Sequence, residues 1–312
     1  MKYSLSSNWL AGECETGEEI ADRAKSLGFD SLELGFSTTM EQAEGFRRRL
    51  GEMPVCSVHA FCPVPVSAPQ GYPELYALAS PDADARAIAR FHVARNVRFA
   101  VTMGAGAVVL HAGRVPLGSF FDRARGTQRL RTVLESCKRD VSAPAYSRLL
   151  AKTLALRRKR GAKLMDPFKK ELEALVPLLE ETGVALALEN LPYLEGFPDE
   201  AETAEICAAF AGAPVKAWFD TGHHRVRECH GWTAGLPEDF SNIAGMHLND
   251  VVDLDDDHLA PGGGKVDFAA LAPMAKAVGR IVFEPKSRVD EASLRRGLEL
   301  VRSMWEGGED DD

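Results

Sequence analysis

VKAWFDTGH, at residues Val215–His223, joins an apolar run of sequence to a carboxylate and an imidazole. The run Val215–Asp220 carries large apolar side chains, which is typical of a strand buried on both faces. Five other apolar runs also end in a residue that can bind a metal. One such ending is expected from composition alone, but six in order along the chain predict side chains that converge where parallel strands end. The other five runs are Val55–His59, Ala107–His111, Val184–Glu189, Ile243–His247 and Ile281–Glu284.

Two further strand-like runs, Tyr3–Ser7 and Ser31–Gly35, bring the predicted strands to eight. Amphipathic segments separate the strands, and this alternation implies parallel pairing. Eight parallel strands are what a closed barrel requires. The sequence therefore predicts an α/β fold, a single (β/α)8 TIM barrel over residues 1–305. The predicted helices are Glu18–Leu27, Met40–Leu50, Ala83–Met103, Pro167–Thr182, Asp199–Phe210, Asp267–Val278 and Glu291–Trp305.

The composition is that of an ordinary globular protein, with 45% hydrophobic and 27% charged residues in a chain of 312. The N-terminus lacks the apolar core of a signal peptide, and no run reaches the roughly 20 apolar residues of a membrane span. The six cysteines contain no C-x2-C pair, which fits reduced thiols. We therefore expect a cytoplasmic protein without membrane partners. The acidic tail Glu306–Asp312 is predicted to be disordered, and the sequence predicts no oligomeric state.

The connection from Gly113 to the predicted helix at Pro167 is far longer than a barrel loop needs. We interpret residues 114–166 as a basic helical insertion after the fourth strand. Between Asp122 and Met165 it carries thirteen Arg or Lys against three acidic residues, although the whole chain has a net charge of −9. Clustered cations attract phosphates, so the insertion could be a lid over an anionic substrate or a nucleic-acid contact. The simpler alternative is a pair of helices with solvated charged faces.

Carboxylates and imidazoles at the predicted strand ends form a candidate metal site. Gly222 allows a sharp turn that returns His223 to the cavity of Asp220. Asp256 and His258 are two residues apart, so in an extended loop both side chains point the same way. Mixed carboxylate and imidazole sets suit Zn2+, Mn2+ or Fe2+. The candidate ligands are His59, His111, Glu189, Asp220, His223, His247, Asp256, His258 and Glu284.

Each candidate ligand also has a purely structural interpretation. Asp220 could cap a turn, and the acidic stretch Asp253–Asp257 could be a solvated loop. The strand histidines could be hydrogen-bonded core residues. The two strand-end glutamates could form ion pairs with Arg or Lys, because a buried charge must be compensated. These alternatives are open for any one residue, and only the set as a whole favours a metal.

The arrangement of these motifs resembles the xylose isomerase-like barrel superfamily, which unites sugar isomerases and epimerases with the endonuclease IV DNA-repair enzymes. The resemblance covers nearly the whole barrel and excludes the insertion. It implies the barrel fold and a site for one to three divalent ions. The motifs that carry it are Glu189-Asn190, Phe219–His223, His247–Asp250, His258 with Gly262 and Gly264, and Phe283–Pro285.

Similarity to the keto-sugar epimerases implies a small-molecule sugar or sugar derivative as substrate and one divalent ion, with Zn2+ or Mn2+ expected. Such an ion acidifies the C–H beside the substrate carbonyl and stabilises the enediolate. Glu189 and Glu284 would be the catalytic base and acid on opposite faces of the substrate. Asp253 is a departure, because these epimerases usually present an arginine there to substrate hydroxyls. The matching ion ligands are Glu189, Asp220, His247 and Glu284, and the expected substrate contacts are Glu195, Asn190, Lys286 and His223.

Similarity to the endonuclease branch implies a trinuclear zinc cluster, for which all nine candidate ligands have a match. Such clusters position a hydroxide and clamp a phosphate. Asp257 stands where the repair motif has an arginine, and the acidic loop around it disfavours a polyanion. We therefore predict a sugar isomerase or epimerase. The alternatives are an AP-endonuclease-like phosphodiester hydrolase with nucleic acid as partner, an inosose-dehydratase-like lyase, and a non-catalytic binding protein.

Overall fold

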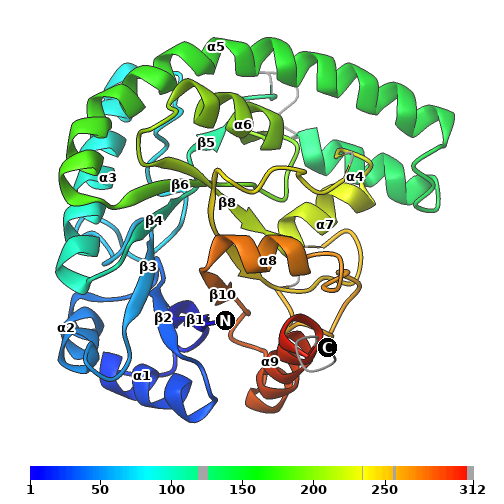
Figure 1. Cartoon of the computed structure of the whole chain (residues 1–312). Coiled ribbons are helices and arrows are strands. Elements are labelled where there is room, and N and C mark those ends of the chain that lie inside the picture. The colour runs from blue at the N-terminus through cyan, green and yellow to red at the C-terminus, as the bar shows by residue number, and fades with distance from the viewer. Residues whose placement is uncertain (119–125, 234, 256–257, 308–312) are drawn as a thin grey trace.

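Eight parallel strands close into a barrel in the computed structural model, which describes residues 1–118, 126–233, 235–255 and 258–307 (Figure 1). The order around the barrel is the order along the chain, with the last strand pairing with the first. This confirms the predicted (β/α)8 architecture. The strands are β1 (Tyr3–Ser6), β2 (Ser31–Leu34), β3 (Val55–His59), β4 (Ala107–Leu110), β6 (Ala185–Glu189), β8 (Val215–Asp220), β9 (Ile243–Leu248) and β10 (Ile281–Phe283).

The helices lie outside the barrel, and a helix forms in each predicted segment, with α3 at the predicted bounds and α8 beginning at Ala272 rather than at Asp267. Side chains cap several of them, as at Thr16 and Thr39, where a capping box satisfies the first backbone donors. No helix in the described part of the chain has both the length and the apolar character to cross a membrane. The helices are α1 (Gly17–Ser26), α2 (Met40–Arg49), α3 (Ala83–Met103), α4 (Gly126–Ser136), α5 (Pro144–Thr182), α6 (Glu200–Ala209), α7 (Thr221–Cys229), α8 (Ala272–Val278) and α9 (Glu291–Glu306).

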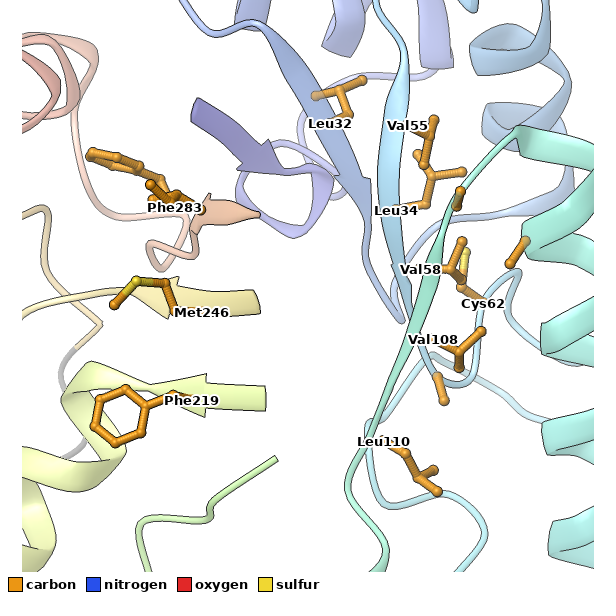
Figure 2. Packing of buried hydrophobic residues seen from close by; sticks show 14 of the residues in the cluster. Leu32, Leu34, Val55, Val58, Cys62, Val108, Leu110, Phe219, Met246 and Phe283 are labelled. Atoms are coloured by element: carbon orange, nitrogen blue, oxygen red, sulfur yellow. The ribbon is translucent and has the colours of Figure 1, made fainter. Parts of the chain in front are cut away.

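Successive side chains of each strand point alternately outward, to the helices, and inward, to the barrel interior. This alternation forms two apolar layers and directs the residues at the strand ends inward. One layer joins strands to helices, and Figure 2 shows part of it, with Val58, Val108 and Leu110 labelled. The other joins strand residues alone across the barrel, including Val109, Ala187, Trp218 and Val282. Because side chains two apart share a face of a strand, the residues two positions after these four point the same way. They are His111, Glu189, Asp220 and Glu284, all at the carboxyl ends of their strands.

The predicted sharp turn after Asp220 is a helix instead, α7, which the sequence analysis missed. The Asp220 carboxylate accepts a hydrogen bond from the backbone N–H of His223 at 2.7 Å and so caps this helix. Gly222 is required for packing, because a Cβ there would lie 1.7 Å from Asn249 Oδ1. The motif therefore positions His223 by starting a helix close to a neighbouring strand end.

The insertion is not a separate pair of helices, because its second helix is continuous with the barrel helix that precedes β6. Helix α5 begins at Pro144 rather than at Pro167, and it contains both Pro167 and Pro177. A proline removes one helical hydrogen bond. Leu164 and Phe168 are buried on either side of Pro167, so packing maintains the helix through it. In Figure 1, α5 arches over the barrel and α4 lies beside its N-terminal half.

Several cations of the insertion are in ion pairs rather than directed at a ligand. Arg131 pairs with Asp255 and Arg139 with Asp253, so the insertion is attached to the acidic loop that follows β9. Arg157 is 2% exposed and pairs with Glu202 at 2.6 Å. These contacts favour a structural role for part of the basic charge.

The first residue of the predicted disordered tail, Glu306, lies in a helix. Glu306 is the last residue of α9, and its carboxylate accepts a hydrogen bond from the Tyr3 hydroxyl at 3.0 Å and pairs with the N-terminal amine at 3.1 Å. The rest of the predicted tail, residues 308–312, lies outside the described residues.

Replacing Arg157 by Ala should lower the free energy of unfolding by about 3–5 kcal/mol, because the half-buried Glu202 would lose its partner and a buried site would be left empty. The carbonyls of Leu194 and Gly196, which also accept from Arg157, would lose their donor. Urea denaturation measures the change. The neighbouring exposed Arg158→Ala is the control, expected within about 0.5 kcal/mol of wild type. Equal losses in both variants would show that the buried ion pair does not hold the insertion.

Candidate metal centre

Glu189, at the end of β6, is the centre of the cluster. Its Oε2 lies 3.1 Å from His59 Nε2 and 3.0 Å from His111 Nε2, and its Oε1 lies 3.0 Å from His247 Nδ1. The carboxylate is fully buried. Three imidazoles from β3, β9 and the end of β4 therefore converge on one side chain, as the strand endings predicted.

His247 connects Glu189 to the two other strand-end carboxylates. Its Nδ1 is 3.2 Å from Glu284 Oε2 and 3.8 Å from Asp220 Oδ2. Its other nitrogen, Nε2, lies 3.0 Å from Glu33 Oε1 on β2. A carboxylate oxygen only accepts, so Nε2 donates to Glu33 and Nδ1 is left to face the cluster. This arrangement is typical of a metal-binding histidine oriented by an outer carboxylate.

Glu33 is a site residue that the sequence analysis missed. It is fully buried in the middle of β2, where Ser57 Oγ donates to it at 2.8 Å. The available signal was the single charged residue inside the strand run Ser31–Gly35. A carboxylate is not buried without a partner, so that position could have been marked as a site candidate.

Three other histidines are oriented by backbone carbonyls. The Nδ1 atoms of His59, His223 and His258 donate to the carbonyls of Ala60, Asn190 and Glu284 at 2.9, 2.8 and 2.8 Å. Each of these bonds keeps a proton on Nδ1, so that Nε2 is the atom available to an ion.

The structure forms three groups of candidate ligand atoms, and within each group the atoms lie within 4.8 Å of one another. Eight of the nine predicted ligands belong to a group, and the ninth, Asp256, lies outside the described residues. The groups are His59 with His111 and Glu189; Asp220 with His223 and His258; and Glu189 with Asp220, His247 and Glu284.

The donor set fits a divalent cation. Glu33, Glu189, Asp220 and Glu284 are all buried, and within the described part of the chain their ion pairs involve only histidines. Like charges this close repel one another at low dielectric unless a cation compensates them. Oxygen and imidazole nitrogen are the donors that Zn2+ and Mn2+ accept.

Two asparagines hold Asp220 in place. Asn190 Oδ1 accepts from the Asp220 backbone N–H at 2.7 Å, and Asn190 Nδ2 donates to the Asp220 carbonyl at 3.1 Å. Asn249 Nδ2 donates to Asp220 Oδ2 at 2.7 Å. The structure therefore uses the Asn190 side chain to orient a candidate ligand, and a direct contact of Asn190 with substrate stays a prediction.

A cavity of about 490 Å3 opens above the cluster and is large enough for a small ligand. His59, His223 and Glu284 line it, together with the predicted substrate contact Lys286. Glu195 has a different partner, because its Oε2 accepts from the N–H and hydroxyl of Thr127 at 3.0 and 2.6 Å. A substrate contact by Glu195 also stays a prediction.

Arg114, Glu74 and Tyr193 form a polar group on the wall of this cavity that the sequence analysis did not identify. Glu74 accepts from Arg114 Nε at 2.7 Å and from the Tyr193 hydroxyl at 2.6 Å. The guanidinium lies 3.6 Å from the centre of the Tyr193 ring. Glu74 also lies 4.0 Å from His111 Nδ1. This group holds Tyr193 rigidly beside the candidate ligands.

The two catalytic candidates have pKa values shifted in opposite directions. Burial raises the pKa of Glu284, and the nearby Glu189 carboxylate adds to this effect against the attraction of His247 and His258. Burial would also raise the pKa of Glu189, but His247 and His111 outweigh it and hold that pKa well below its usual range. Opposite shifts in neighbouring carboxylates are typical of acid and base pairs.

The fold and the strand-end residues define a (β/α)8 barrel with a candidate metal site at the carboxyl ends of its strands. A sequence model of the xylose isomerase-like TIM barrel family matches residues 21–143 and 148–304, and the chain belongs to this family. No curated protein sequence matches the chain.

Solved structures similar to this chain share its fold at low identity. The 3-keto-D-glucoside 4-epimerase YcjR of E. coli is 17% identical, with a TM-score of 0.66 over 97% of this chain and 99% of that one. The D-psicose 3-epimerase of Clostridium cellulolyticum H10, solved with D-tagatose, is 13% identical, with a TM-score of 0.63 over 98% and 99%. A Thermus thermophilus protein whose structure was solved after soaking with ZnCl2 is 19% identical, with a TM-score of 0.60 over 99% and 100%.

Binding of Zn2+ to the metal-free protein should release protons. Burial would lower the pKa of His247, but the Glu284, Glu33 and Glu189 carboxylates raise it well above its usual value. The imidazole is therefore protonated at neutral pH without an ion and must lose that proton to bind one. The Zn2+ affinity should rise with pH, about tenfold per unit for each proton released. Titration calorimetry in buffers of different ionisation enthalpy measures the number of protons.

The control for this experiment is His92→Gln, which changes a histidine stacked on Tyr76 outside the ligand groups. It should release as many protons as wild type. A binding enthalpy independent of the buffer would contradict the predicted protonation of His247.

Proposed function

We propose that the protein is a divalent-metal-dependent isomerase or epimerase that acts on a sugar or sugar derivative. The observation that carries the proposal is the pair Glu189 and Glu284. Both carboxylates contact the same imidazole nitrogen of His247, at 3.0 and 3.2 Å, beneath a cavity of about 490 Å3. Their pKa values are shifted in opposite directions, so one is suited to accept a proton and the other to donate one.

Glu189, Asp220, His247 and Glu284 would hold the ion, and Zn2+ or Mn2+ suits their donor atoms. A divalent ion held there would polarise a substrate carbonyl and so make the adjacent C–H more acidic. Asn190 and Asn249 hold Asp220, and Glu33 holds His247, so the ligands need little rearrangement to bind it.

The two glutamates would move the protons. Glu189, deprotonated at neutral pH, takes the proton from the carbon beside the carbonyl, and the C–H electron pair moves toward the carbonyl oxygen. Glu284, whose pKa is raised by burial, would return a proton to carbon as the carbonyl re-forms. Delivery to the opposite face inverts the carbon, which is epimerisation. Delivery to the adjacent carbon, with proton transfer between the oxygens, is isomerisation.

The similar structures support this proposal. Two of them are named as epimerases of sugars, one acting on a 3-keto-D-glucoside and one solved with D-tagatose. The family membership is compatible with this chemistry. The cavity, lined by imidazoles and by Lys286, suits a small polyhydroxylated molecule.

Wild-type protein loaded with Mn2+ or Zn2+ should exchange deuterium from D2O into carbon positions of at least one member of a panel of ketoses and inososes. Glu189→Gln and Glu284→Gln should each slow the exchange by about 10²- to 10⁴-fold, because each removes a proton-transfer group. Proton NMR follows the exchange, and metal analysis of each variant separates loss of the ion from loss of the proton transfer.

The matched control is Glu181→Gln at the exposed end of α5, which should exchange at the wild-type rate. A dehydrated product, formed when the C–H proton and a hydroxyl group leave as water, would indicate a lyase instead. Absence of exchange across the panel by metal-replete protein would contradict the proposed function.

Phosphodiester hydrolysis is a second candidate, favoured by one observation. One ligand group shares Glu189 with the second group and Asp220 with the third, which is the kind of arrangement that can hold adjacent ions. Against it, Arg131 and Arg139 are paired with Asp255 and Asp253 instead of being directed at a phosphate backbone. Because these arginines are already paired, we favour the sugar substrate over the phosphodiester.

A duplex with one abasic site decides between the two candidates. With zinc supplied, the isomerase proposal predicts no strand cleavage at high protein concentration. It also predicts one tightly bound ion per chain in protein purified without chelator. Cleavage at the abasic site together with three ions per chain would establish the hydrolase.

A further inference from the structure

A second cavity of about 490 Å3 adjoins the one above the metal centre. The two cavities have Pro192, Tyr193 and Lys286 in common in their linings. None of the candidate metal ligands in the described part of the chain lines the second cavity. A ligand could therefore extend into it from the metal centre without displacing a ligand residue.

The insertion builds the outer wall of this second cavity. Thr127 and Arg131 of α4 line it, together with Val226 of α7 and Leu254 of the loop after β9. An apolar cluster that includes Leu130, Leu134, Tyr146 and Leu254 packs the insertion against that loop. The wall is therefore part of the folded structure, and the insertion contributes two of the residues that line the cavity.

Tyr193 separates the two cavities as a fixed aromatic wall. Its hydroxyl is held by Glu74, and Arg114 covers one face of its ring at 3.6 Å. Arg114 lines the metal cavity and does not line the second one. We infer that the opposite face of the ring is the one turned to the second cavity. A rigid aromatic face beside Pro192 suits the C–H face of a sugar ring.

The polar groups of the second cavity favour an uncharged, hydroxylated ligand over an anion. The Arg131 guanidinium is bound to both carboxylate oxygens of Asp255 and donates from Nε to Glu135 at 3.2 Å. Lys286 and Arg288, the other cations of the lining, each have a partner. The paired Arg131 and Asp255 present donors and acceptors together, which is what hydroxyl groups require.

We propose that this second cavity is a subsite for a second, uncharged sugar unit, so that the substrate is a disaccharide or a glycoside rather than a free monosaccharide. The keto-sugar unit would lie over the metal centre, and the second unit would lie between Tyr193 and the insertion. This inference rests on the proposed function for the chemistry of the first unit. It gives the insertion a role in substrate selection.

The test compares D-fructose with maltulose and isomaltulose, in which a glucosyl unit extends fructose at O4 or O6. Deuterium exchange from D2O by the metal-loaded full-length protein gives kcat/KM for each. At least one disaccharide should exceed D-fructose by about tenfold or more, since the second unit adds binding that the monosaccharide lacks. Equal values, or a preference for D-fructose, would overturn the proposal.

A pair of arginine variants isolates the subsite. Arg131→Ala should lower the ratio of disaccharide to D-fructose kcat/KM by about tenfold, because Arg131 lines the cavity. Arg139→Ala removes an equivalent ion pair from the same loop, with Asp253, but Arg139 lines neither cavity and should leave the ratio unchanged. The same ratio in both variants would contradict the assignment of the subsite.

Saturation-transfer difference NMR with maltulose and isomaltulose keeps the test independent of turnover and of variant folding. Strong saturation of the glucosyl protons of either sugar, in the wild-type protein, is the expected result. If no sugar exchanges deuterium but the glucosyl protons are saturated, the proposed function fails and the subsite stands. Saturation confined to the fructosyl protons of both sugars would overturn the subsite.

Discussion

Burial of several carboxylates at one end of the barrel is the constraint on which the rest of the site depends. Glu189 receives three imidazole contacts at 3.0–3.1 Å, and Glu284 and Asp220 approach the same histidine, His247. An isolated buried carboxylate is costly, so this grouping requires compensating positive charge. In the metal-free protein His247 supplies part of it, since the surrounding carboxylates raise the pKa of this imidazole. A divalent cation held by the same atoms would supply more, with the protons leaving as it binds.

The surrounding residues orient this cluster before any ion or substrate arrives. Glu33 sets the ring of His247, backbone carbonyls set the rings of His59, His223 and His258, and two asparagines hold Asp220. All of these partners belong to strands or to the residues directly after them. A site held on rigid strand ends keeps its geometry better than one held on loops, and this favours both metal binding and proton transfer.

The insertion changes the surroundings of this site without contributing a ligand to the described groups. Its arginines form ion pairs with the loop after β9 and with α6, and its apolar residues pack under that loop. Much of the positive charge that the sequence presents as a possible phosphate contact is therefore used internally. What the insertion offers to a ligand is part of a cavity wall, where Arg131, paired with Asp255, lines the same cavity as Tyr193.

The sequence by itself determined the barrel and most of the ligand set, because both depend on local pattern. Buried strands are recognisable as apolar runs, and a two-residue period places the residue two positions after Val109, Ala187 or Trp218 on the barrel interior. Only the tertiary structure decided which residues support those ligands. Glu33 meets His247 across 214 positions of sequence, and no local pattern specifies such a pair. Helix α5 likewise continues through Pro167 because packing on both sides outweighs the lost hydrogen bond. The tertiary fold also determined the partners of Arg131, Asn190 and Glu195, because it brings together charged and polar groups that are far apart in the sequence.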